Sequence, residues 1–214
     1  MDARHRLMPY TSYAELAREN LEGLDYQRSW RQSPVSTLVH LAIHGGNIEP
    51  GSGELAAAAA DQIHDLYVFD AMKTPSSELH ITSTLFDDPA AHTLARAATH
   101  TLSWHGCAGS APVTHLGGLD YALRDRVGLA LHQAGFTVQI AGAELAGVDS
   151  RNICNLNTRK LGVQLEISTA QRAAFFVGGD LSRPNRENRT DLFHAYVAAV
   201  RTAVAQGLVT TNRG

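Results

Sequence analysis

Short apolar segments recur along the chain, each bounded by glycine, proline or polar residues. Such segments, rich in β-branched residues, are typical of buried β-strands. Segment 37–43, TLVHLAI, is one of them, and two glycines follow its next residue, His44. The same pattern predicts strands at 37–43, 66–71, 79–86, 98–104, 136–141 and 162–168.

Segments with helical spacing of apolar residues lie between these strands. Leucine or valine recurs at every fourth position from Leu119 to Leu131, which is typical of a helix with one buried face. Ser52 and Thr190 are expected N-caps, because each precedes a helical pattern and can accept a bond from a free backbone N–H. Helices are expected at 12–22, 53–64, 88–97, 118–134 and 190–205.

Alternating strands and helices predict an α/β fold with a mostly parallel sheet. The 214 residues contain no internal repeat and no linker, so one domain spanning 1–214 is expected. In sheets of this kind, ligands bind at the carboxyl ends of the strands, near the point where the strand order reverses. Polar residues at those ends are therefore the first candidates for chemistry.

Composition narrows the choice of partners and location. The net charge of −3 provides no basic field for nucleic acid or an anionic membrane. A monomer is expected. No apolar run has the length of a membrane span, and the first residues, MDARHRLMPYTSYAEL, lack the apolar core of a signal peptide. A cytoplasmic location is expected, unless lysis or another route releases the protein. Cys107 and Cys154 are too few for a disulfide framework, whether they pair or stay free.

Two strands end in the same way, with a histidine followed by glycine. His44 precedes Gly-Gly, His105 precedes a single glycine, and Glu49 lies five residues after His44. Two imidazoles and one carboxylate form a common open zinc site, and glycines let a turn bring such groups inward. The alternative is that the histidines are hydrogen-bonded strand ends and that Glu49 is a solvated loop acid.

Glu166 lies within GVQLEIS, an otherwise apolar strand (162–168). Alternation places Glu166 on the same side as Gln164 and Ser168, which are polar. This side faces either solvent or a cavity that holds a cation, because a lone carboxylate is rarely buried without a partner. In the second case Glu166 is a candidate general base for a zinc-activated water, returning the proton to the leaving amine.

Three further residues are candidates for binding substrate. Arg151 and Arg159 lie in SRNICNLNTRK, either an exposed loop or a segment that pairs with carboxylates. His80 begins the strand predicted at 79–86. If that strand runs antiparallel to its neighbours, His80 lies at the catalytic edge as a substrate-binding residue, a neighbour of the ligands or a competing ligand.

Together, several stretches in this order resemble the poly-γ-glutamate hydrolase family, which includes phage-encoded depolymerases. They are HGGNIEPGSGELA, LHITSTLFDDP, SWHGCAG, GGLD and RNICNLNTRKLGVQLEIS, and the resemblance spans about residues 36–205. It implies a three-layer α/β/α fold with a mixed sheet, similar to the zinc carboxypeptidases. It also implies zinc ligation by His44, Glu49 and His105, with Glu166 as the base and γ-glutamyl amide bonds as the substrate.

The sequence departs from the zinc carboxypeptidases at one point, and other functions remain open. Their His-x-x-Glu spacing is stretched here to His-x4-Glu, which makes Glu49 a less secure ligand than either histidine. A carboxypeptidase or a deacylase of small N-acyl amino acids is the alternative enzyme. A binding protein with a structural zinc is the non-catalytic alternative, which needs His80 or a cysteine as a fourth ligand.

Overall fold

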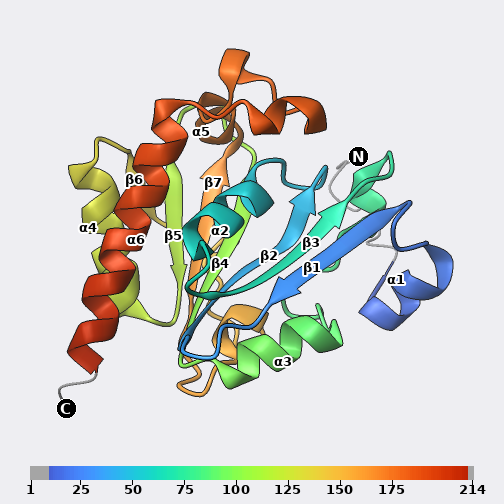
Figure 1. Cartoon of the computed structure of the whole chain (residues 1–214), viewed down its shortest axis with the longest axis horizontal. Coiled ribbons are helices and arrows are strands. Elements are labelled where there is room, and N and C mark those ends of the chain that lie inside the picture. The colour runs from blue at the N-terminus through green and yellow to red at the C-terminus, as the bar shows by residue number, and fades with distance from the viewer. Residues whose placement is uncertain (1–9, 212–214) are drawn as a thin grey trace.

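The strands form one mixed sheet of seven strands in the order β1-β3-β2-β4-β7-β5-β6 (Figure 1). The computed structural model describes residues 10–211. The pairs β2–β3, β2–β4, β4–β7 and β5–β6 are parallel, whereas β1–β3 and β5–β7 are antiparallel. This confirms an α/β fold with a mixed, mostly parallel sheet. The strands are β1 (Tyr26–Arg31), β2 (Leu38–Gly46), β3 (Asp65–Ala71), β4 (His100–Cys107), β5 (Thr114–Gly118), β6 (Val138–Ile140) and β7 (Val163–Ser168).

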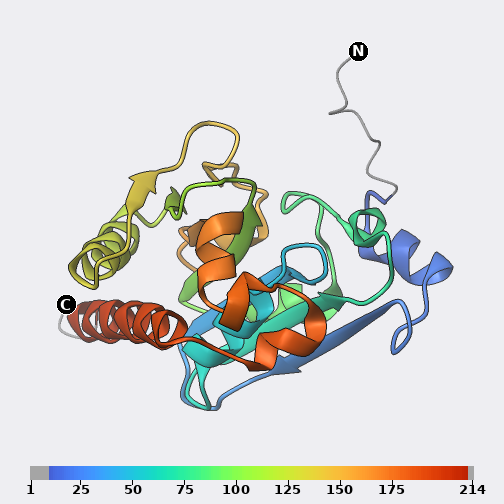
Figure 2. The same cartoon turned by 90° about the horizontal axis from the view of Figure 1, so that it is seen from above.

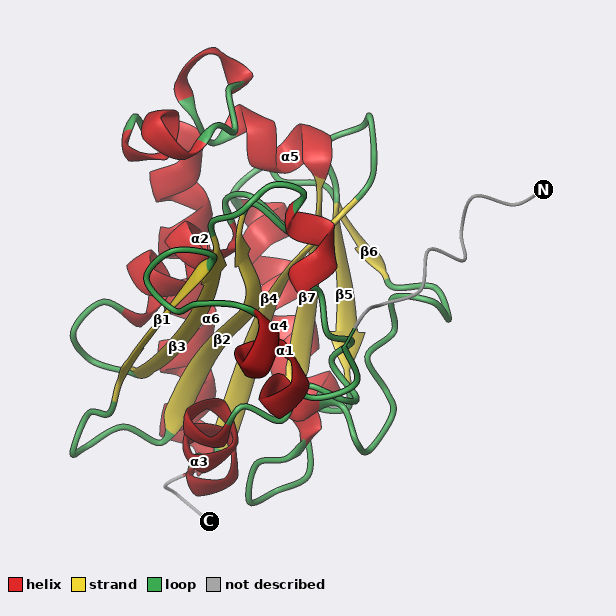
Figure 3. Ribbon diagram, turned by 90° about the vertical axis from the view of Figure 1, so that its right-hand side faces the viewer, coloured by secondary structure: helices red, strands yellow, loops and turns green. Residues whose placement is uncertain are grey.

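Helices cover both faces of the sheet (Figures 2 and 3). Along β2, Leu38 and Ala42 face a core formed with α2, α4 and α6, while Val39 and Leu41 face a second core that includes residues of α1 and α3. The chain therefore has the three layers that the family resemblance implies. The α-helices are α1 (Tyr13–Glu19), α2 (Ser52–Ala60), α3 (Pro89–Ala97), α4 (Tyr121–Gln133), α5 (Thr169–Ala174) and α6 (Asp191–Thr211). Four short 3₁₀ helices are η1 (Ser76–Leu79), η2 (Ile153–Asn155), η3 (Val177–Gly179) and η4 (Arg183–Glu187).

The strand order reverses between β2 and β4. From β2 the chain passes through α2 to β3 on one side, whereas β4 has β7 on its other side. The two strands are parallel neighbours, so their carboxyl ends lie together at a switch point, where α/β folds place their ligands.

The prediction of a strand at 79–86 is wrong. This segment begins at the end of η1 and continues as a turn, without pairing to any described strand. The alternation that suggested a strand is nevertheless real, because Leu79, Ile81 and Phe86 are buried in the second core. These residues pack against one face of the sheet instead of extending it as a further strand.

Two strands were not predicted, and one N-cap differs from the prediction. β1 reads YQRSWR and lies at the sheet edge, where Tyr26 is its one buried residue, so it lacks an apolar run. β5 occupies residues just before the expected helix, which starts at Tyr121 with Asp120 as its N-cap. The N-cap of α2 is Gly51 and not Ser52. α6 begins at Asp191, directly after Thr190, whose hydroxyl donates to the Ala174 carbonyl.

Two other expectations concern termini and cysteines. Residues 1–9, which begin the segment assessed for a signal peptide, lie outside the described residues. Among residues 10–211, no helix combines the length and apolar character that crossing a membrane would require. Cys107 and Cys154 are both free thiols.

Candidate active site

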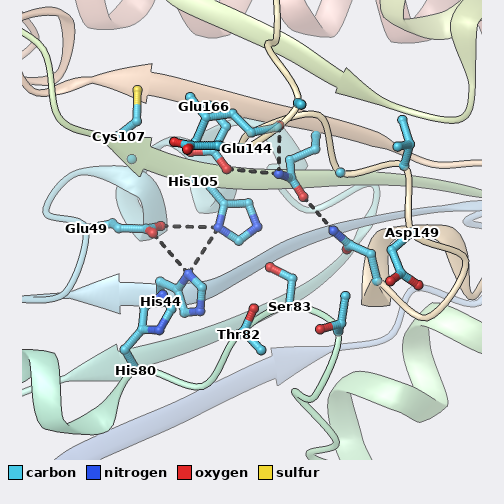
Figure 4. A pocket seen from close by; sticks show the side chains of 18 of the residues that line it. His44, Glu49, His80, Thr82, Ser83, His105, Cys107, Glu144, Asp149 and Glu166 are labelled. Carbon is cyan, nitrogen blue, oxygen red and sulfur yellow. Dashed lines mark hydrogen bonds and ion pairs between the residues drawn. The ribbon is translucent and has the colours of Figure 1, made fainter. Parts of the chain in front are cut away.

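His44 and His105 meet at the switch point. His44 lies near the carboxyl end of β2 and His105 near the carboxyl end of β4, and their Nδ1 atoms are 3.1 Å apart. Both side chains are buried, with exposed fractions of 3% and 2%. The strand ends that the sequence singled out therefore converge on one point (Figure 4).

Gly45 and Gly46 permit β2 to continue past His44 against β3. The pairing of β2 with β3 shifts register between Ala42 and Gly45. A Cβ on Gly45 would lie 2.7 Å from the Phe69 carbonyl oxygen, and Gly46 has a φ of +68° with the Ala71 backbone even closer. Only glycine fits both positions, because a side chain would clash with the backbone of β3.

Glu49 faces both histidines from the loop that connects β2 to α2. Its Oε1 lies 3.0 Å from His44 Nδ1, and its Oε2 lies 3.4 Å from His105 Nδ1. The loop is fixed by bonds from the Glu49 N–H to the His44 carbonyl and from the Ser52 hydroxyl to the Glu49 carbonyl. One donor atom from each of the three residues lies within 4.8 Å of the others.

The outer nitrogens of both imidazoles are also bonded. His44 Nε2 lies 2.8 Å from the Ile81 carbonyl oxygen, and His105 Nε2 lies 2.9 Å from the Ser103 hydroxyl. A carbonyl can only accept, so His44 donates from Nε2, and its neutral imidazole presents the lone pair of Nδ1 to the site. Such outer bonds fix the ring orientation of metal-binding histidines in other proteins.

The charges and donors of these residues fit a divalent cation. Burial disfavours a charge on Glu49, yet the two facing histidines hold the pKa of its carboxyl below the ordinary value. Burial also opposes a charge on His105, but Glu49 and Glu166 raise its pKa overall. Glu49 Oε2 is buried and has no hydrogen-bond partner among the described residues. A nitrogen–nitrogen–oxygen set with an unsatisfied carboxylate oxygen suits Zn²⁺.

Glu166 lies next to this cluster on the neighbouring strand. It is directly opposite His105 in the β4–β7 register, and only 7% of it is exposed. Gln164 Nε2 donates to Glu166 Oε1 at 2.9 Å, and Asn152 Nδ2 donates to Gln164 Oε1 at 2.9 Å. Burial raises the pKa of Glu166, and the charge of nearby His105 opposes this only in part. The polar side of β7 thus faces a pocket and not open solvent.

The pocket that joins these residues has a volume of about 530 Å³. Its lining comes from the carboxyl ends of β2 and β4, from Glu49 in the loop after β2, from β7 and from two segments, 80–84 and 143–152. Glu144 and Asp149, two acids of the second segment, lie on its wall, together with the Cys107 side chain at the end of β4 (Figure 4). Burial and the neighbouring Glu166 raise the pKa of the Cys107 thiol.

The structure brings His80 to the site, although not on a strand. Its ring stacks on His44 with 4.0 Å between ring centroids. Burial, and next the charge of His44, lowers the pKa of His80 to about 3, so this imidazole is neutral at physiological pH. It lines the pocket but is outside the three-residue cluster of potential ligands.

The two arginines are placed differently from each other, and neither lines the pocket. Arg159 lies at the opposite end of β4, where its Nη1 is 2.6 Å from Asp120 Oδ2 and 2.7 Å from His100 Nδ1. Arg159 therefore lies away from the pocket, where it ties β4 to the start of α4. Arg151 pairs with Asp149 at the pocket wall, with 2.7 Å from Nη2 to Oδ2 and a side chain that is 72% exposed.

A buried arginine that the sequence did not single out holds the site segments together. The guanidinium of Arg172 donates to the carbonyls of Pro50, Ile167 and Cys107. These carbonyls belong to the Glu49 loop, to β7 and to β4, which carry three of the candidate residues. The sequence signal was weak, because an arginine after a strand usually lies at the surface.

Gly106→Ala is expected to disturb this arrangement. A Cβ on Gly106 would lie 2.5 Å from Cζ and Nε of Arg172, whose guanidinium cannot move without losing its buried bonds. We expect the free energy of unfolding in urea to fall by about 2 kcal/mol, the middle of the range for overpacking a core. Gly142→Ala is the matched control, because nothing lies within 4 Å of its Cβ position. Equal stability of the two variants would contradict the role given to Arg172.

Three solved structures share the fold of this chain. The chain superimposes with a TM-score of 0.91 on a bacteriophage poly-gamma-glutamate hydrolase, at 32% identity, covering 94% of this chain and 99% of that one. It matches the zinc-free apo form of YNDL with a TM-score of 0.86 at 28% identity, covering 93% and 98%. N-formylglutamate amidohydrolase from Ralstonia eutropha JMP134 shares the fold alone, with a TM-score of 0.52 and 13% identity. Fold and pocket together define a hydrolytic enzyme of the α/β class.

Sequence comparison gives the family. Residues 10–199 match the poly-gamma-glutamate hydrolase family. Similar proteins of Bacillus subtilis (strain 168) include UPF0714 protein YmaC and SPbeta prophage-derived UPF0714 protein YoqZ. YmaC is 34% identical over 90% of this chain and 82% of its own length, and YoqZ is 36% identical over 89% and 69%. The chain belongs to the poly-gamma-glutamate hydrolase family.

Proposed function

We propose that this enzyme hydrolyses γ-glutamyl amide bonds of poly-γ-glutamate and uses a zinc ion held by His44, Glu49 and His105. The observation that carries the proposal is the cluster of three inward-facing donor atoms within 4.8 Å, beside the carboxylate of Glu166 in an open pocket. The zinc-free form of the related YNDL structure supports the choice of metal, and the family supports the choice of substrate.

Three protein donors favour a catalytic over a structural site. Structural zinc sites are usually closed by four protein ligands, whereas catalytic sites keep one position for water or substrate. Among the described residues, neither His80 nor Cys107 joins the cluster. A zinc ion held by His44, Glu49 and His105 would therefore keep a position for water or substrate.

Each residue has a defined task in this proposal. A bound zinc ion would polarise the scissile carbonyl and lower the pKa of a coordinated water toward about 7. Glu166 accepts a proton from the attacking water and delivers it to the departing nitrogen. Gln164 holds Oε1 of that carboxylate, which leaves Oε2 to face the reaction.

The alternative enzyme differs in the length of its substrate. A carboxypeptidase or a deacylase of small N-acyl amino acids would release one terminal unit at a time, or act on monomers only. A depolymerase cuts internal bonds, so viscosity falls long before free glutamate accumulates. An open pocket of about 530 Å³ lined by several loops suits a polymer that enters and leaves it.

The decisive experiment follows polymer size and metal content together. The purified protein, its chelator-treated form and the same form with zinc restored are each incubated with poly-γ-glutamate. We expect an early fall in viscosity, no activity after chelation and recovery with zinc. Release of glutamate monomers at constant viscosity, or cleavage of N-acyl amino acids alone, would favour the alternative enzyme. Full activity in protein free of metal would reject the zinc.

A further inference from the structure

Segment 82–84 places three adjacent hydroxyls in the pocket. Thr82, Ser83 and Thr84, which we call the hydroxyl ledge, all line it and are all half-buried. In the close-up view, the oxygens of Thr82 and Ser83 point toward the side of the pocket where His44 and His105 lie (Figure 4). The ledge therefore borders the proposed metal site.

The backbone of the hydroxyl ledge is held on both sides. Ile81, directly before it, is fully buried and its carbonyl accepts a bond from His44 Nε2. The Thr82 carbonyl accepts from the backbone N–H groups of Leu85 and Phe86, and the Ser83 carbonyl accepts from Ile153. Hydroxyls on such a fixed turn need little reorganisation to bind a ligand.

The side chains of the hydroxyl ledge are free to bind. Within residues 10–211, none of the three hydroxyls has a hydrogen-bond partner, and none is a fully enclosed atom. Each can donate one bond into the pocket. Three unengaged donors beside a hydrolytic centre indicate an acceptor-rich ligand.

No lysine or arginine side chain among residues 10–211 lines the rest of the pocket. Its described lining contains Glu144, Asp149 and Glu166 but neither lysine nor arginine. Arg151, the cation beside the wall, is engaged by both oxygens of Asp149. Carboxylates of a polyanionic substrate therefore meet neutral donors at this point in place of a guanidinium.

We propose that the hydroxyl ledge binds the α-carboxylate of a γ-linked glutamate next to the cleaved bond. This inference rests on the proposed function. Hydroxyl–carboxylate bonds are charge-assisted and short, so they fix position as well as register along the polymer. Because the donors carry no charge, recognition depends little on ionic strength. Segment 82–84, which lies outside the metal cluster, thus contributes to substrate specificity.

The test compares variants of the hydroxyl ledge on two substrates. Thr82→Val and Ser83→Ala remove hydroxyls with little change in volume, and Thr82→Ser keeps one. Thr202→Val, at an exposed position of α6, is the control. The substrates are a γ-glutamyl oligomer and the same oligomer with its α-carboxylates converted to amides. We expect KM for the unmodified oligomer to rise about tenfold in Thr82→Val and in Ser83→Ala, because each variant loses one hydrogen bond to a charged carboxylate. KM for the amide, zinc content and the control should be unchanged.

Other outcomes separate the ledge from the proposed function. If the wild type cleaves the oligomer and the ledge variants keep its KM, the ledge is rejected while the function stands. If Arg151→Ala alone raises KM, and added salt weakens wild-type binding steeply, the guanidinium is the carboxylate site and the ledge is rejected. Calorimetric binding of the oligomer supplies a readout without turnover, and a wild type that neither binds nor cleaves it overturns both proposals.

Discussion

His105→Ala and His44→Ala are each expected to lose the bound zinc and, with it, hydrolysis of poly-γ-glutamate. The cluster has one donor atom from each of three residues, so either change leaves two. Removing a residue that only orients a ligand typically costs 10–100-fold in metal affinity. Removing a ligand itself should therefore weaken zinc binding by at least about 100-fold. Metal analysis after dialysis, together with the viscosity assay, measures both effects.

Two further variants make this result specific. His132→Ala changes an exposed histidine on α4 and should leave zinc and activity intact. Ser103→Ala removes the hydroxyl beside His105 Nε2 and should reduce zinc affinity by about 10–100-fold without abolishing binding. Stoichiometric zinc in both ligand variants would mean that the metal, if present, lies elsewhere.

The meeting of His44 and His105 could be predicted because both signals are local. Each histidine ends an apolar run, each is followed by glycine, and parallel strands bring their carboxyl ends to one edge. The switch point between β2 and β4 was not visible, since strand order depends on contacts between distant segments. The sequence thus predicted at which end of the sheet the site lies, while the structure showed that β2 and β4 are neighbours.

The polar surroundings of the site were harder to foresee. Thr82 and Ser83 stand in a segment whose alternation favours a strand, and only the absence of a pairing partner makes it a wall of the pocket. Arg159 shows the opposite case, because a cation in an asparagine-rich loop suggested binding but pairs with Asp120 instead. A sequence does not show which way a charged side chain points. The role of each arginine could be assigned only after its bonding partner was known.

Gln164 illustrates how one residue changes the interpretation of another. Alternation correctly placed Gln164 and Glu166 on one side of β7 but left open whether that side faces solvent or a cavity. The structure resolves this choice through burial, because only 7% of Glu166 is exposed and its amide neighbour bonds to Asn152 in turn. A surface strand would not need such a chain of buried hydrogen bonds.

Glu166→Gln is expected to retain zinc, fold normally and still bind polymer, while turnover falls by about 10²–10⁴, the usual contribution of a positioned acid–base group. Burial raises the pKa of this carboxyl, which makes its charged form a stronger base than an exposed glutamate. Glutamine keeps the volume and can accept the bond from Gln164 Nε2 through its amide oxygen. It then presents an amide nitrogen to the pocket, and that nitrogen cannot take a proton.

Glu144→Gln is the matched control for this substitution, because Glu144 lines the same pocket but is exposed. An exposed change of this kind typically alters stability by less than about 0.5 kcal/mol, and turnover should stay within a few-fold. Single-turnover kinetics with metal analysis of both variants separate the outcomes. A Glu166→Gln enzyme with full zinc and full turnover rejects Glu166 as the base. One that loses zinc while Glu144→Gln keeps it makes Glu166 a ligand, and the proton must then be carried by another group. Loss of turnover with zinc retained is the only result that the adjacent positions of Glu166 and His105 in the sheet lead us to expect.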